Sequence, residues 1–308
     1  MSSSKSSKNS NPPSQLFSAG NYQKIGIDKF RAFQGNTRIE QLTISSGGYA
    51  SIDGSNMPPG ADKNQHGISI QKLNIGYGGA AFTSDTYIAS LCVSNFGSAI
   101  LHDTCIKDVI VKLGGSVRIE SCCRDLGGIV NVTSSGSLTA CIANMDIKAR
   151  DGGVVTIGDR RNSYTDSGCT VEAMTGARVH VRDHTARVAL YHGAWCEIYS
   201  GGDVHHGNIA YGGGFVVSNG GCLSSTSAAS DGVIHCLSGG ELSHVYVSSG
   251  ATAILHDGCH VYDLHVYSGG ELRFVNFSSG FLEDITVTEG GRMRTVREVF
   301  DFHESNSR

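Results

Sequence analysis

The chain has 308 residues, of which 41 are glycine and four are proline, and its formal net charge is −4. This low, balanced charge provides no basic face, so we expect no nucleic-acid partner. No stretch approaches the roughly 18 consecutive apolar residues of a membrane helix, so we also expect no membrane insertion.

The first segment, residues 1–41, is predicted to be a polar arm that ends in a cap for the following fold. Residues 1–14 are rich in Ser, Lys, Asn and Pro, a composition typical of disorder. Apolar residues further on, such as Phe30 and Phe33, could cover the open end of a stack of strands.

Residues 1–20 lack the apolar core of a signal peptide. A chain that starts at Met1 would therefore be expected in the cytoplasm. A passenger fragment of a longer gene product would instead be expected at the cell surface.

From residue 42 to residue 296 one short pattern recurs: an apolar residue, any residue, a second apolar residue, two more residues and a glycine. Two apolar residues separated by one lie on the same face of a strand. The glycine then permits the positive φ of a tight corner. The pattern begins at Leu42, Leu73, Val109, Ile147, Val171, Val188, Cys196, Phe215, Ile234, Val245, Leu264, Val275 and Ile285.

The glycine spacing indicates how these strands are arranged. Gly201, Gly220 and Gly239 are nineteen residues apart, and Gly250 and Gly269 have the same separation. Gly280 and Gly290 continue the series at about half that interval. A strand this short cannot bury its apolar face alone, but stacked coils form a continuous core.

We therefore predict an all-β fold: a single parallel β-helix, or β-solenoid, with coils of about 19–20 residues over 42–296. The rival β-propeller would need blades of about 40–45 residues. Residues 53–66, which include Pro-Pro-Gly, are expected to form a loop. Residues 297–308 are expected to form a C-terminal cap and a frayed tail.

The chain contains ten cysteines and no Cys-x-x-Cys pair, which argues against a zinc knuckle. Cys196 and Cys236 occupy apolar positions of the repeat and are predicted to point inward as reduced thiols. Cys105, Cys123 and Cys141 are spaced by one coil and could form an internal thiol ladder. A disulfide between neighbouring coils is the alternative.

Five glycine-containing units recur over 237–296, near the C-terminal end. They read LSGGEL (237–242), VSSGAT (247–252), YSGGEL (267–272), FSSGFL (277–282) and TEGGRM (288–293). These units resemble the passenger repeats of AIDA-like autotransporter adhesins. This resemblance implies a bacterial, secreted, adhesive β-helical passenger, in which serines and threonines can be glycosylated by heptosyltransferases.

Aromatic residues concentrate in one part of the repeat region, where a cluster on a flat face could stack on sugars. The candidates are Tyr191, Trp195, Tyr199 and Tyr211, and Trp195 is the single tryptophan. The competing interpretation is that these side chains pack over a widened coil.

Histidine and aspartate also cluster in the sequence. His180 and His184 share a strand face, Asp203 precedes His205 and His206, and His256, His260 and His265 accompany Asp257 and Asp263. We interpret these as solvent-facing strand positions, because a metal site would need ligands to converge from several coils. The prediction is no metal and no cofactor.

Candidate catalytic groups are sparse. Parallel β-helix lyases and hydrolases need clustered carboxylates, with or without Arg or Lys. The best candidates, Asp183 with Arg182 and Arg187, or Glu283 with Asp284, do not repeat at coil spacing. We predict no catalytic residues and no enzyme activity.

The sequence favours a structural, adhesin-like β-solenoid that presents a repetitive surface to glycans or cell-surface proteins. The alternatives are a carbohydrate-active β-helix enzyme and an intracellular scaffold.

Overall fold

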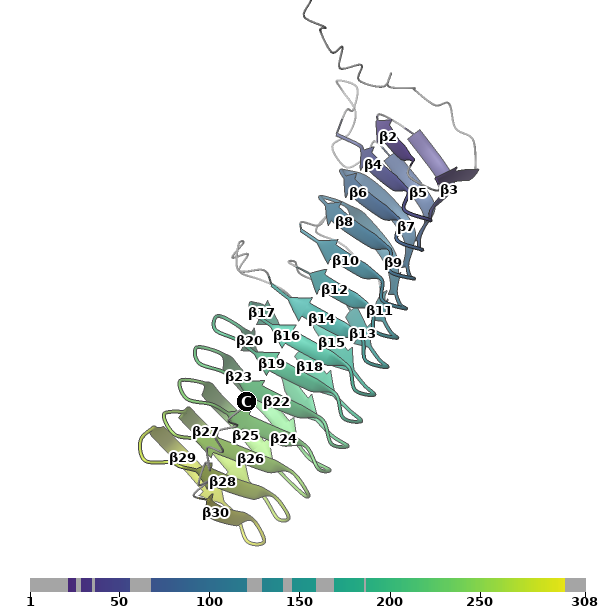
Figure 1. Ribbon diagram of the computed structural model, residues 1–308. Helices are drawn as coiled ribbons and strands as arrows, with labels where there is room; N and C mark the ends of the chain where they lie inside the picture. The colour runs from purple at the N-terminus through teal and green to yellow at the C-terminus, as the bar shows by residue number, and fades with distance from the viewer. Residues whose placement is uncertain are drawn as a thin grey trace, which may run out of the picture.

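The computed structural model describes residues 22–25, 29–34, 37–55, 68–120, 129–140, 146–158, 169–185 and 187–296. All helical or strand structure in these ranges is β-strand, and the strands pair in parallel in two long sheets (Figure 1). The chain alternates between the sheets, so each coil adds a strand to both. The predicted β-solenoid is confirmed.

The first sheet, sheet A, has sixteen strands in the described part of the chain. They are β1 (Tyr22–Ile25), β3 (Thr37–Ile44), β5 (Ile68–Ile75), β7 (Thr86–Val93), β9 (Cys105–Val111), β11 (Ile129–Val132), β13 (Asp146–Ala149), β15 (Thr170–Ala173), β17 (His184–Thr185), β18 (Arg187–Leu190), β20 (Asp203–Val204), β21 (Gly207–Ile209), β23 (Cys222–Ala228), β25 (Glu241–Val247), β27 (His260–Val266) and β29 (Phe281–Val287).

The second sheet, sheet B, has fourteen strands over the same described ranges. They are β2 (Phe30–Gln34), β4 (Tyr49–Asp53), β6 (Ala80–Ser84), β8 (Ser98–His102), β10 (Ser116–Ile119), β12 (Ser137–Ala140), β14 (Val154–Ile157), β16 (Arg178–Val181), β19 (Trp195–Ile198), β22 (Gly214–Val217), β24 (Val233–Cys236), β26 (Thr252–His256), β28 (Glu271–Val275) and β30 (Arg292–Val296).

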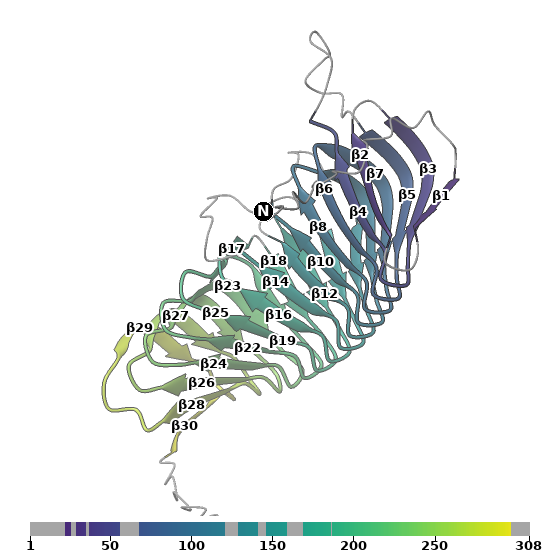
Figure 2. The ribbon, with the colours of Figure 1, turned by 45° about the horizontal axis from the view of Figure 1, so that its top comes forward.

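The pairing register sets the coil length. In the C-terminal half Val216 pairs with His235 and His235 with Ile254, nineteen residues apart each time. Further toward the N-terminus the interval varies, from seventeen residues between Val171 and Val188 to thirty-one between Leu42 and Leu73. Figure 2 shows the corners of successive coils aligned along one edge despite this variation.

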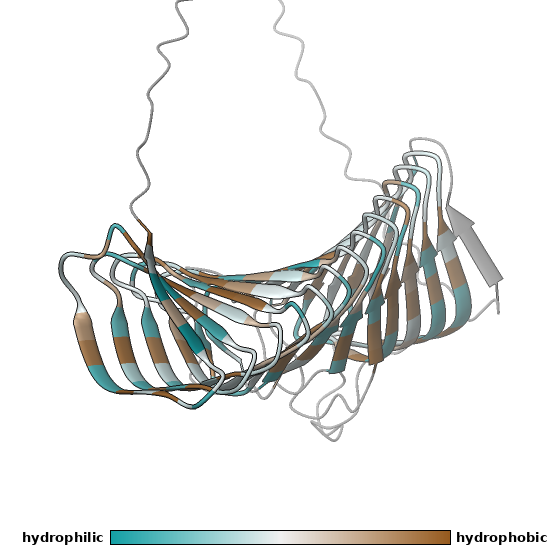
Figure 3. Cartoon of the chain, turned by 90° about the horizontal axis from the view of Figure 1, so that it is seen from below, coloured by the Kyte–Doolittle hydropathy of each residue, from teal (hydrophilic) through white to brown (hydrophobic). Residues whose placement is uncertain are grey.

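The interior is a dry column of apolar side chains. Both apolar residues of most repeat units are fully buried, as Leu42 and Ile44 are in sheet A and Cys196 and Ile198 in sheet B. Figure 3 shows the resulting apolar bands on successive strands. Burial of these side chains, at about 25 cal/mol per Å² of apolar surface, is the main favourable term in coil stacking.

Two corner types recur among the described connections between the sheets. At Ser45–Gly48 two consecutive residues have positive φ, Ser46 at 52° and Gly47 at 74°, as in a type I′ turn. At Tyr199–Gly202 positive φ is confined to Gly201, at 84°, as in a type II turn. In both, the fourth residue donates its N–H to the first carbonyl, at 3.0 Å and 2.8 Å.

Gly280 departs from the corner role that the repeat suggests. The other predicted corner glycines have positive φ, whereas at this unit Asn276 has φ 49° instead. A Cβ at Gly280 would stand 2.6 Å from the Phe277 ring and 2.8 Å from the Cys259 carbonyl oxygen. Close packing, rather than a left-handed backbone, is what requires glycine here.

The ends of the described stack differ. At the N-terminal end, β1 and β2 pair in parallel with β3 and β4, so the ladder runs through the segment expected to cap it. At the C-terminal end, Phe281 is 46% exposed and Met293 61% exposed. Residues 1–21, 56–67 and 297–308, which hold the predicted tail and most of the predicted disordered arm and loop, lie outside the described residues. Asp53, the first residue of the loop expected over 53–66, ends β4 instead.

The cysteines named in the sequence prediction differ in their environments. Cys196 and Cys236 are fully buried free thiols at apolar repeat positions. Cys105 is half-buried and disulfide-bonded, so the reduced thiol expected there is wrong. Cys105 begins β9 beside the inward-facing Ile106, so it does not point into the core. Cys123 and Cys141, the other members of the proposed thiol ladder, lie outside the described residues.

The largest fully buried side chain, Phe215, generates a stability prediction. Its ring fits because Gly207, paired with Val188 in the opposite sheet, has no side chain: a Cβ there would stand 3.1 Å from the ring. Phe215→Ala should cost about 3–5 kcal/mol. Thermal unfolding and amide hydrogen exchange of β19, β22 and β24 would measure the loss.

Phe96→Ala is the matched control, because Phe96 is 81% exposed. Its removal should change stability by about 0.5 kcal/mol or less, as is usual for surface substitutions. Equal loss of protection in both variants would contradict the buried position of Phe215.

Candidate functional site

The outer face of sheet B carries a row of rings. Trp195 begins β19, His235 lies on β24 and His256 ends β26. The Trp195 and His235 centroids are 6.2 Å apart and those of His235 and His256 are 5.9 Å apart, the latter pair stacked within 22°. Three half-buried rings from three coils thus form one surface, which we name the ring platform.

Gly214 makes this platform possible. It is the register partner of Trp195 on β22, the strand between Trp195 and His235. A Cβ at Gly214 would stand 2.6–2.9 Å from three atoms of the six-membered indole ring. The indole therefore covers Gly214 and reaches His235 two coils away.

Polar groups border the platform on its N-terminal side. A hollow of about 200 Å³ is lined by Arg178, His180, Trp195 and Glu197. The Glu197 carboxylate lies 3.4 Å from His180 Nδ1 and accepts a short hydrogen bond from the Tyr199 hydroxyl. The hollow thus combines an apolar ring wall with a guanidinium and a carboxylate.

Tyr199 is held in place by its neighbours. Its hydroxyl lies 3.3 Å from His180 Nδ1, and the Arg182 guanidinium carbon lies 4.9 Å from its ring centroid. A cation over an aromatic face is worth about 0.5–1 kcal/mol at exposed sites. Because its hydroxyl and its ring both have partners, Tyr199 is held in place next to His180 and Glu197, which line the hollow.

The environment shifts two pKa values. Burial lowers the pKa of His180 below its usual 6.5, with Arg182 and Arg178 adding to the shift and Glu197 opposing it. The hydrogen bond to Glu197, together with burial, raises the pKa of Tyr199 above 10. At neutral pH the imidazole and the phenol are therefore both uncharged, beside an anionic carboxylate.

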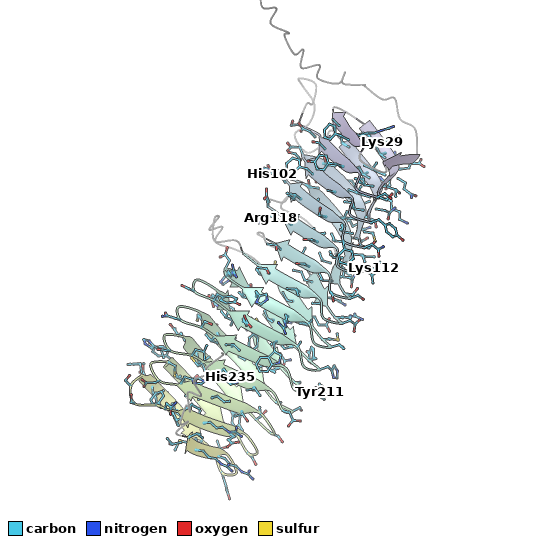
Figure 4. The ribbon with its side chains drawn as sticks, in the orientation of Figure 1. Lys29, His102, Lys112, Arg118, Tyr211 and His235 are labelled. Carbon is cyan, nitrogen blue, oxygen red and sulfur yellow. The ribbon has the colours of Figure 1, made fainter. Side chains whose placement is uncertain are left out.

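The other two sequence candidates lie elsewhere. Tyr191 and Tyr211 belong to corners that lead from sheet A to sheet B, and Tyr211 stacks on His192 at 5.2 Å. Figure 4 shows Tyr211 at the corner edge of the stack and His235 on the face. The structure thus brings together Trp195 and Tyr199, and it leaves Tyr191 and Tyr211 outside this group.

Sequence reasoning missed a second group of rings, on sheet A. Tyr246 stacks on His265 at 5.5 Å and on Tyr267 at 6.3 Å. His265 is also paired with Asp263 at 2.6 Å. The nineteen-residue separation of Tyr246 and His265 was the available signal, since it equals one coil.

The first set of catalytic candidates, Asp183 with Arg182 and Arg187, lies around the end of β16 and the start of β18. Arg182 lies over the Tyr199 ring, while the Asp183 carboxylate accepts the backbone N–H of His184 at 2.8 Å. Arg187 begins β18 in sheet A. Arg182 and Asp183 thus make separate local contacts, one with a ring and one with the backbone.

Two of the free thiols, Cys196 and Cys222, also lack the character of nucleophiles. Burial raises the pKa of Cys196 well above its usual value. Burial, with the carboxylates of Asp203 and Glu241, raises the pKa of Cys222 to about 12. Both are protonated at neutral pH, whereas thiol catalysis requires the thiolate.

A solved structure shares this architecture: the TibC-catalysed, hyper-glycosylated TibA fragment, residues 55–350. The match covers 89% of this chain and 96% of that one, with 23% sequence identity and a TM-score of 0.50. The resemblance to AIDA-like passenger repeats is thus confirmed at the level of the β-solenoid. No family model and no curated protein matches the chain. None of the described residues belongs to a helix with the length and apolarity that a bilayer crossing requires.

The packing of Trp195 on Gly214 can be tested directly, because the chain has one tryptophan. Gly214→Val should force the indole off the sheet and into water, since the added atoms would occupy the ring's position. We expect a red shift of the fluorescence emission. Ser116→Val, at the start of β10, is the control and should leave the emission unchanged. An unshifted spectrum in the Gly214 variant would contradict the packing.

Glu197→Gln tests the electrostatics of the hollow. Removing the carboxylate should lower the pKa of His180 further, because Glu197 raises it against burial. It should return the pKa of Tyr199 toward 10, because the Glu197 hydrogen bond is the main cause of the rise. Histidine NMR shifts and phenolate absorbance against pH would measure both, with His180→Gln and Tyr199→Phe assigning the signals. A pKa that rises in either group would contradict this arrangement.

Proposed function

We propose that the chain is a non-enzymatic, adhesin-like β-solenoid that binds glycans on the outer face of sheet B. The ring platform of Trp195, His235 and His256 supplies the stacking surface. The hollow beside it supplies hydrogen-bonding groups. The expected ligand is a hydroxyl-rich, uncharged saccharide on a cell surface.

The observation that carries this proposal is the position of the Trp195 ring over Gly214. A large ring on an outer strand face buries little apolar surface unless it packs against another group. Here Gly214, which has no side chain, leaves the space that the indole ring occupies. Aromatic side chains with one apolar face and one wet edge are typical of recognition surfaces. Sugar C–H groups are apolar enough to pack on such a ring.

The bordering charges favour an uncharged ligand. Arg178 and Glu197 line the same hollow with opposite charges. A guanidinium donates hydrogen bonds and a carboxylate accepts them, so the pair satisfies the hydroxyl groups of a sugar in both roles. A strongly anionic glycan would meet the Glu197 carboxylate at unfavourable cost.

The solenoid geometry supports adhesion over catalysis. Glycosidic cleavage uses two carboxyl groups about 5–10 Å apart across the scissile bond. Around the platform Glu197 is the one carboxylate of the hollow, and its partners are His180 and Tyr199. In this proposal the glycan is a ligand, whereas the TibA fragment carries glycans as a modification.

Trp195→Ala should weaken glycan binding by about 2 kcal/mol or more, which is about thirtyfold in Kd. Hits from a glycan array would be followed by calorimetric titration of the full chain. Tyr211→Ala is the matched control, because Tyr211 is an exposed aromatic residue outside the platform.

Two outcomes would contradict the proposal. One is an array with no signal at micromolar protein. The other is equal binding by the wild type and the Trp195 variant. Release of new reducing ends from a bound glycan would show glycosidic cleavage and would support the alternative of a carbohydrate-active enzyme.

A further inference from the structure

A second group of side chains lies where the chain passes from sheet B back to sheet A. Two very short strands, β17 and β20, pair with each other and lie off the main path of sheet A. His184 is the register partner of Asp203 in this pair, and His205 follows directly after β20. Neither the resemblance nor the proposed glycan face uses these residues.

Three potential ligand atoms converge here. Asp203 Oδ2 lies 3.2 Å from His184 Nδ1 and 3.6 Å from His205 Nε2. One ligand atom from each of the three residues fits within a span of 4.8 Å. The two imidazole rings meet edge to face, with centroids 4.4 Å apart. The donors come from two neighbouring coils, which is the convergence that a metal site requires.

These spacings match a coordination shell. Zinc binds histidine nitrogen and carboxylate oxygen at about 2.0–2.2 Å in tetrahedral geometry, which places neighbouring donors about 3.3–3.6 Å apart. Both measured separations lie close to that range without rearrangement. Imidazole nitrogen with carboxylate oxygen is a donor set suited to zinc and neighbouring transition metals.

A further contact orients one of the ligands. Ser224 Oγ, on β23, lies 3.2 Å from His205 Nδ1. When Nδ1 donates to this hydroxyl, Nε2 carries the lone pair and faces Asp203, which is the tautomer that a metal selects. A histidine ligand held through its second nitrogen is a recurring feature of metal centres.

The Asp203 carboxylate could accept a further hydrogen bond or a metal ion. Its Oδ1 atom is buried and has no N–H or O–H donor within the described part of the chain. The Cys222 thiol, a weak donor, also hydrogen-bonds to this carboxylate. A buried carboxylate oxygen without a partner is costly. A cation beside the carboxylate would offset that cost more fully than the hydrogen bonds from His184 and from the Cys222 thiol do.

We propose that His184, Asp203 and His205 bind one divalent transition-metal ion of the zinc class. The ion ties the coil of β17 to the coil of β20. Three protein ligands leave the fourth coordination position of a tetrahedral ion for water or for Cys222. Cys222 is the register partner of Asp203 on the next strand, β23. The proposal is independent of the glycan function.

The chain contains its own matched control. His244, Asp263 and His265 repeat the His–Asp–His composition on sheet A, with His265 at 2.6 Å and His244 at 3.7 Å from opposite oxygens of Asp263. Among the described residues, the first trio alone places all three ligand atoms within mutual reach. The two clusters therefore separate a built site from nonspecific histidine binding.

The experiment is calorimetric titration of the full chain with Zn²⁺, repeated with Co²⁺ for its absorption spectrum. We expect one tight site per chain, and its loss in His184→Ala/His205→Ala and in Asp203→Asn. His244→Ala/His265→Ala should retain it, and Ser224→Ala should bind about 10–100-fold more weakly. A thiolate–cobalt absorption band that disappears in Cys222→Ser would identify the fourth ligand as Cys222, and its absence would leave water in that position.

Zn²⁺ should also slow amide exchange in β17 and β20 of the wild type but not of the double variant. Trp195 emission and circular dichroism would verify that each variant is folded. Identical Zn²⁺ affinity in the wild type and the His184/His205 variant would overturn the proposal. So would tight binding that survives Asp203→Asn or disappears in the His244/His265 control.

Discussion

Parallel pairing places each residue beside its equivalent in the next coil, and this constraint governs both the inside and the outside of the rod. Strands in one sheet lie about 4.8 Å apart, so side chains at one register position form a column. Inside, the columns are apolar and exclude water. Outside, a column brings together residues about nineteen positions apart, such as Tyr246 and His265. The register alone therefore brings rings into stacking contact and opposite charges into pairs on the outer faces.

The buried core could be predicted from the sequence because the pattern that specifies it lies within a few consecutive residues. Each repeat unit of two apolar residues and a glycine specifies a strand and a corner, and Val245, Val247 and Gly250 behave as that pattern predicts. Units such as Val117 and Ile119, in sheet B, escaped detection because no glycine follows at the same distance. Buried threonines support some of those corners instead, as where Thr83 and Thr104 hydrogen-bond between coils at 2.8 Å.

The side-chain contacts on the outer face could be predicted only in part, because they depend on the register between neighbouring coils. Trp195 and Tyr199 could be grouped from the sequence, since both lie along one strand and its exit. Tyr191 could not be separated from them without knowing that a corner intervenes before Trp195. The positions of His235 and His256 relative to Trp195 depend on coil length and on the missing side chain at Gly214, and neither is a property of a short window.

The two proposed sites also share a mechanical basis. In a solenoid each coil contacts its immediate neighbours, so a constraint between two coils acts mainly on those two. The hollow is walled by Arg178 and His180 from one coil and by Trp195 and Glu197 from the next. The same two coils continue, past one corner, into His184 and Asp203. A cation held between them would therefore fix the relative position of the two walls of the hollow. The backbone pairing of β17 with β20 itself extends over only two residues.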